Sequence, residues 1–65
     1  SQFEIISTEK VNSVQVLDAS GRMVFVGNPN VSSYSVDGKS WANGPYLLKI
    51  ETDLGTVHKR ILKSN

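Results

Sequence analysis

The apolar residues of this chain come in short bursts, and no segment sustains the period of an amphipathic helix. The bursts are rich in Val, Ile, Phe and Tyr, and clusters of Gly, Pro, Asn and Asp separate them. β-Branched and aromatic residues favour a pleated, half-buried strand, whereas the separating residues favour turns. The pattern therefore predicts short strands joined by turns, and an all-β fold.

Each predicted strand is bounded by turn residues or by a polar stretch. The strands are expected at residues 2–7, 12–17, 22–26, 32–36, 46–52 and 56–63. Residues 8–10 are polar and are expected to turn the chain between the first two strands. Residues 40–43 are expected to form a loop or one helical turn. Together these elements predict a small antiparallel immunoglobulin-like β-sandwich of about six to seven short strands, with an open barrel as the alternative.

Three aspartates lie close to glycines at predicted turns. In residues 18–21, Asp18 can accept hydrogen bonds from turn amides and Gly21 can adopt a left-handed conformation, which favours a type I turn followed by a bulge. Asp37 and Asp53 stand in similar settings. Paired carboxylates can hydrolyse glycosides, but turn chemistry is the favoured explanation for an Asp at each of these places.

The size and composition of the chain narrow the possible functions. It has 65 residues and a mass of 7.1 kDa, enough for one domain, which is predicted to span residues 1–65. A domain of this size buries about 60% of the surface of its unfolded chain, so little room is left for a deep pocket beside a core. The absence of cysteine excludes disulfides, thiolate nucleophiles and Cys-ligated metals. A net charge of +1 is too small to give an electrostatic field that attracts nucleic acids or membranes strongly, and no nucleic-acid partner is expected.

His58 is the only histidine, and Lys59 and Arg60 follow it. A metal site needs three or four converging ligands, and adjacent cations repel a metal ion, so His58 is expected to be an exposed strand residue. No Gly-x-Ser-x-Gly motif accompanies any serine, and the glycines are scattered rather than gathered in a phosphate-binding loop. The sequence therefore predicts no catalytic residue, no cofactor-binding or metal-ligating residue, and no enzymatic activity.

Trp41 allows two interpretations. Its ring could lie exposed and stack on a sugar or a partner, or it could plug one end of a thin core. The plug is favoured because large apolar area is scarce in so short a chain. The stacking interpretation leads to an alternative function, an accessory β-sandwich binding module of a surface adhesin or carbohydrate-active enzyme, in which Trp41 and Tyr34 line a ligand face.

The last predicted strand carries the one charge asymmetry of the sequence, since Lys59, Arg60 and Lys63 lie close together. Such a strand is explained equally well as a solvated edge whose charges prevent aggregation and as a recognition strand that pairs with a partner. Residues 23–26 are apolar and uncharged, and this edge is expected to support a homodimer of the isolated domain at high concentration.

Three segments, taken in order, resemble a known family. They are residues 14–24, residues 42–50 and residues 57–63. Together they resemble the type A C-terminal sorting domain of proteins exported by the type IX secretion system, also called the Por secretion system, of Bacteroidetes-type bacteria. The resemblance covers about residues 3–63. Trp41 departs from the family pattern, in which Leu is usual at this place.

The resemblance implies a non-catalytic sorting signal at the end of a longer secreted protein. The passenger, joined in cis, would cross the inner membrane by an ordinary signal peptide, and the outer-membrane type IX translocon would then recognise the folded sorting domain. In many members a sortase-like protease removes the domain at the cell surface and joins the passenger to lipopolysaccharide. The implied localisation is secreted or at the outer-membrane surface, via the periplasm.

The resemblance also assigns residues to roles. Translocon recognition falls on the C-terminal segment Lys59, Arg60, Ile61, Leu62 and Lys63. The family hairpin motif matches Asp18, Gly21 and Arg22, and the family Gly-x-Tyr strand matches Gly44 and Tyr46. Of these, Gly21 is expected to serve the turn, and Arg22 either stabilises the hairpin or contacts the receptor.

Overall fold

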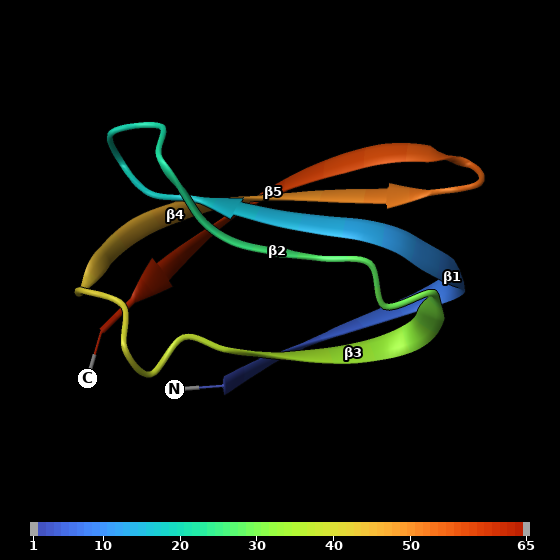
Figure 1. Cartoon of the computed structure of the whole chain (residues 1–65), viewed down its shortest axis with the longest axis horizontal. Coiled ribbons are helices and arrows are strands. Elements are labelled where there is room, and N and C mark those ends of the chain that lie inside the picture. The colour runs from blue at the N-terminus through green and yellow to red at the C-terminus, as the bar shows by residue number, and fades with distance from the viewer. Residues whose placement is uncertain (1, 65) are drawn as a thin grey trace.

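The computed structural model describes residues 2–64, which form five β-strands. They are β1 (Gln2–Leu17), β2 (Met23–Gly27), β3 (Val31–Asp37), β4 (Gly44–Thr52) and β5 (Gly55–Lys63), and every pairing is antiparallel (Figure 1). Over this range there is no helix long and apolar enough to span a membrane. The all-β class and the antiparallel arrangement are confirmed. Ser1 and Asn65, the ends of the predicted domain, lie outside the described residues.

β1 is a single strand of 16 residues, where the sequence predicted two strands separated by a turn at residues 8–10. The predicted turn is wrong because this stretch contains neither Gly nor Pro, and the backbone stays extended through it. What changes here is the pairing: Ile6 lies opposite Ser33, and the register then shifts before Val11. The number of strands is therefore five rather than six to seven.

The two halves of β1 belong to two layers. The C-terminal half lies between β2 and β4, which gives a four-stranded layer of order β2-β1-β4-β5. The N-terminal half pairs with β3 and forms a two-stranded layer. Figure 1 shows β3 beside the beginning of β1 along one side of the molecule, with the rest of β1 and β4 toward the opposite side. This arrangement is consistent with a small β-sandwich.

The core lies between these layers and consists of alternate residues, because successive side chains of a strand point to opposite faces. The buried hydrophobic residues are Ile5, Val11, Val14, Val16, Val36, Tyr46, Leu48 and Ile50. They come from β1, β3 and β4. The edge strands β2 and β5 add the partly buried Val24, Phe25 and Ile61. β1 and β4 therefore form the centre of the domain, and β5 rests on it with one face.

Trp41 closes one end of the core, which confirms the plug interpretation. Its ring centroid lies 5.1 Å from that of Tyr46 and 5.8 Å from that of Phe3. Gly38 is buried beneath the indole, where an added Cβ would come within 2.7 Å of the ring. The loop holds this shape through a bond from the Trp41 N–H to the Gly38 carbonyl at 3.0 Å, and it contains no helical turn.

Candidate recognition surface

The three segments that carry the family resemblance meet at one end of the four-stranded layer. Leu17, just before the β1–β2 turn, lies opposite Leu47 of β4, and Lys63 at the end of β5 lies opposite Gly44. Two hollows of about 460 and 450 Å³ flank this meeting point. Both are lined by Asp18, Ala19, Pro45 and Tyr46. The fold therefore brings together residues that are far apart in the sequence.

Backbone hydrogen bonds close the β1–β2 turn. The Gly21 N–H donates to the Asp18 carbonyl at 3.0 Å, and the Asp18 N–H donates to the Arg22 carbonyl at 2.8 Å. Gly21 has a φ of 86°, in the left-handed region that favours glycine. This is the predicted type I turn followed by a bulge.

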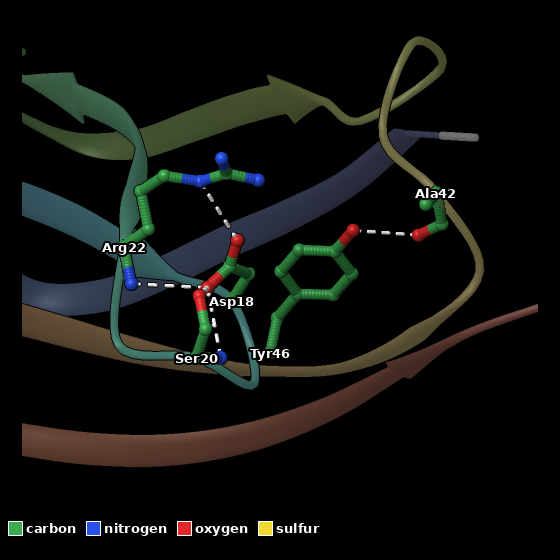
Figure 2. A network of polar contacts seen from close by, with 5 residues as sticks. All are labelled: Asp18, Ser20, Arg22, Ala42 and Tyr46. Carbon is green, nitrogen blue, oxygen red and sulfur yellow. Dashed lines mark hydrogen bonds and ion pairs between the residues drawn. The ribbon is translucent and has the colours of Figure 1, made fainter.

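The Asp18 carboxylate is bonded entirely within this turn (Figure 2). Its Oδ1 accepts hydrogen bonds from the Ser20 hydroxyl at 2.6 Å and from the N–H groups of Ser20 and Arg22 at 3.0 Å. Its Oδ2 accepts a bond from Arg22 Nε at 3.2 Å. These bonds, the Ser20 hydroxyl first, lower the pKa of Asp18 to about 2. Asp18 and Gly21 are therefore structural, whereas the Arg22 side chain is 79% exposed.

The other two turn aspartates differ from each other. Asp37 Oδ1 accepts a bond from the Lys39 N–H at 3.0 Å, as expected for a turn carboxylate. Asp53 Oδ1 instead accepts a bond from the side-chain amide of Asn12 at 2.9 Å. In that turn it is the Thr52 hydroxyl that accepts the Leu54 N–H, at 3.1 Å. The turn-capping role predicted for Asp53 is wrong, because its carboxylate ties β1 to the β4–β5 turn.

Gly44 and Tyr46 are structural as well. Gly44 has a φ of 144°, which side-chain-bearing residues rarely adopt. Tyr46 is 6% exposed, and its hydroxyl donates to the Ala42 carbonyl at 2.6 Å (Figure 2). A buried phenol bonded to a carbonyl a few residues upstream resembles the tyrosine corner of immunoglobulin domains. This bond holds the loop that carries Trp41 against the core.

β5 divides the predicted recognition residues between two faces. Val57, Lys59 and Ile61 point toward the two-stranded layer, where they line a hollow with residues of β1 and β4. Arg60 and Leu62 therefore point to the opposite, outer face of the four-stranded layer. β5 pairs with β4 and has a second edge that carries no ladder.

Two of the five predicted recognition residues make contacts inside the domain. The Lys63 ammonium donates to the backbone carbonyls of Lys39, at 3.2 Å, and of Trp41. Ile61 is partly buried against the core. Lys59, Arg60 and Leu62 are exposed, Leu62 at 74%. The five residues therefore comprise two that fix the end of β5 and three that are accessible.

The sequence reasoning missed the surroundings of Arg60. Leu47 lies directly opposite Arg60, and Pro45 directly opposite Leu62, across the β4–β5 ladder. Leu47 also lies opposite Leu17, and it is 37% exposed. The signal was present in the sequence, because Leu47 is apolar at an outward position of an alternating strand. We call the set Leu17, Pro45, Leu47, Arg60 and Leu62 the outer patch.

The outer patch consists of apolar side chains around one guanidinium. His58 lies beside it as an exposed residue. Among residues 2–64, no group of three or more His, Cys, Asp or Glu side chains is placed to hold a metal ion. The chemistry available is apolar contact and charge-assisted hydrogen bonding.

The comparisons with known proteins give one finding. The family model described as the secretion system C-terminal sorting domain matches residues 1–64 of this chain. No curated protein and no solved structure matches this chain. The family match includes all five strands and the whole of the outer patch.

Proposed function

The chain belongs to the family of secretion system C-terminal sorting domains, the sorting signals of type IX secretion, and on this premise we propose how it serves export. It is a single domain at the C-terminal end of a longer secreted protein, and its role is non-catalytic. It directs its passenger, joined in cis, from the periplasm through the outer-membrane type IX translocon. The observation that carries this proposal is the family match over residues 1–64.

The translocon recognises the last strand through the outer patch and Lys59. Exposure supports this choice, because Lys59, Arg60 and Leu62 reach solvent. A guanidinium set among apolar side chains is typical of the residues that dominate protein–protein binding energy, since the partner excludes water around it. Ile61 and Lys63 act indirectly, because their contacts fix the end of β5 on the core.

The motif residues of the other two segments have a supporting role. Asp18 and Gly21 shape the β1–β2 turn, and Gly44 with Tyr46 shapes the start of β4. Both lie against the outer patch. In this proposal they keep Leu17 and Leu47 in register with Arg60 so that the receptor meets one continuous surface. Arg22 is exposed but does not belong to that surface.

The last steps of the proposed pathway follow export. A sortase-like protease at the cell surface removes the domain and joins the passenger to lipopolysaccharide. The family resemblance supports these steps. The passenger is then secreted or held at the outer-membrane surface.

The isolated domain is proposed to form a homodimer at high concentration through β2. β2 is an edge strand of the four-stranded layer, and its Met23 and Val26 are 47% and 55% exposed. An uncharged apolar edge pairs readily with a second copy. Light scattering over the accessible concentration range measures this. A monomer throughout would contradict it.

The alternative function, a binding module with an aromatic ligand face, is not favoured by the contacts of its two aromatic residues. Tyr34 lies 6.3 Å from Phe25, between centroids, and Trp41 packs on Phe3 and Tyr46. Both rings are partly buried against the core. Part of each ring is therefore used for packing within the domain.

The test of the proposed function is a fusion. Residues 1–65 are attached to a periplasmic reporter in a type IX-competent bacterium, and the reporter is assayed at the surface and in the medium. The expected result is exported reporter in the competent strain and periplasmic reporter in a translocon mutant. A folded fusion that stays in the periplasm of the competent strain would contradict the proposal.

A further inference from the structure

Two strand edges without ladder partners border the same side of the sandwich. β5 pairs with β4, and the N-terminal half of β1 pairs with β3, which leaves one open edge on each. Between them lie two hollows of about 480 and 400 Å³. Phe3 and Ile61 line both, so the hollows adjoin. We call this continuous depression the flank groove. Figure 1 shows the start of β1 and the end of β5 at the same end of the molecule, and residues of both line the hollow of about 400 Å³.

The walls of the flank groove are largely apolar and come from both layers. The apolar lining residues are Phe3, Ile5, Ile6, Trp41, Leu48, Ile50, Val57, Ile61 and Leu62, and the charged Glu4 and Lys59 lie among them. Ile6 is 77% exposed and Val57 is 50% exposed, so the domain itself leaves this area open to solvent. An open backbone edge beside pockets for alternate side chains is the geometry of β-strand addition.

The charge of β5 selects between possible occupants. β5 carries Lys59, Arg60 and Lys63 and no acidic residue. If the β5 strands of two copies paired antiparallel about Lys59, the two Lys59 side chains would lie directly opposite each other. Like charges in that position are destabilising. Among residues 2–64 the one ion pair joins Arg22 to Asp18. Lys63 is bonded to backbone carbonyls of the domain, so Lys59 on the groove face and Arg60 on the outer face are the cations of β5 that are available to acidic groups of a partner.

We propose that the flank groove binds an extended segment of a partner protein in which apolar and acidic residues alternate. The segment pairs its backbone with the open edge of β5. Its apolar side chains enter the groove beside Val57 and Ile61, and its acidic side chains lie on the outer side next to Arg60. This inference rests on the proposed function, because it assigns the segment to a component of the type IX machinery. It adds a second surface, which adjoins the outer patch at Leu62.

The test uses a short labelled peptide that alternates valine with glutamate, titrated against the 65-residue chain by fluorescence anisotropy. Two control peptides accompany it, one with lysine in place of glutamate and one with N-methylated backbone amides. We expect saturable binding of the first peptide only. The lysine peptide tests the charge requirement, and N-methylation blocks the ladder.

Substitutions then locate the binding site. Val57→Glu places a charge in the groove, and Val26→Glu is its matched control, since Val26 is a 55% exposed valine on the other edge strand. We expect Val57→Glu to weaken binding roughly tenfold or more and Val26→Glu to leave it unchanged. Ile6→Glu, on the opposite wall, gives a second variant in case Val57→Glu does not fold. Circular dichroism establishes folding of each.

The inference would be overturned if the valine–glutamate peptide failed to bind, if either control peptide bound equally well, or if Val26→Glu caused an equal loss. Self-association that Val57→Glu abolishes would also overturn it, because the groove would then be an interface between copies. Export separates this inference from the proposed function. Normal export of the Val57→Glu fusion would reject the groove alone, whereas failure of the unmodified fusion would reject the proposed function.

Discussion

The β1–β2 turn and β5 both match the family pattern, but they use their polar residues in opposite ways. In the turn, the Asp18 carboxylate accepts four hydrogen bonds, all from Ser20 and Arg22 of the same turn. In β5, Lys59 and Arg60 extend into solvent. Residues that match one family pattern therefore differ in their contacts, and we propose that those bonded within the domain are structural whereas the exposed ones serve recognition.

Burial also separates the structural residues from those proposed for recognition. Tyr46 lies in the core and its hydroxyl is bonded, so a change there acts on folding. Leu62 is 74% exposed, so a change there leaves the folded state nearly as stable and acts on binding.

Leu62→Glu is expected to have the largest effect on export. It puts a carboxylate into the outer patch opposite Pro45, and export of the reporter fusion should fall roughly tenfold or more while stability changes by about 0.5 kcal/mol or less. Leu54→Glu is the matched control, because Leu54 is 78% exposed at the other end of β5. Equal losses in the two variants would show that apolar exposure in general, rather than the outer patch, governs export.

Gly21→Ala is expected to destabilise the domain without removing the recognition surface. No heavy atom lies within 4 Å of the added Cβ, so the cost is the backbone strain of φ 86°, about 1–2 kcal/mol. Denaturant unfolding measures this, and Gly21→Asn should recover part of the loss because Asn tolerates this conformation. Export should fall only as far as the folded fraction falls.

Lys63→Met is expected to loosen the end of β5. The substitution keeps the apolar stem and removes the bonds to the Lys39 and Trp41 carbonyls, at a cost of about 1 kcal/mol. Hydrogen exchange at residues 60–63 should accelerate, and Lys39→Met should leave it unchanged. A loss of export as large as that of Leu62→Glu, with unchanged exchange, would show that Lys63 contacts the translocon directly.

Asp18 is expected to have the smallest effect, visible only in acid. Its pKa is lowered from the ordinary 3.8 to about 2 in the folded chain, so the stabilisation is complete above pH 3.8 and is lost as pH falls through about 2. Asp18→Asn should flatten the dependence of stability on pH in that window. If the pH dependence of stability persists in Asp18→Asn, other carboxyl groups cause it.

The sequence predicted the local features of the fold better than its long-range contacts. The turn at Asp18 was predictable because its geometry follows from residues 18–22 alone. The continuity of β1 was not predictable, because the polar residues that suggested a turn remain extended where the neighbouring residues change their pairing partner.

The candidate site was predictable to a similar extent. Exposure of Arg60 follows from strand alternation and from its place at a sheet edge. The bonds of Lys63 to the loop at residues 39–41, and of Asp53 to Asn12, depend on segments brought together only by the complete fold. No local pattern contains that information.

The central claim is that the outer face of β5, rather than the β1–β2 turn, is recognised for export. It is tested most directly by reversing the exposed arginine of each region, Arg60→Glu and Arg22→Glu, in the same reporter fusion, and measuring the exported fraction of folded protein. We predict that Arg60→Glu leaves the reporter in the periplasm and that Arg22→Glu exports normally. Normal export of Arg60→Glu, or an equal loss with Arg22→Glu, would contradict the claim.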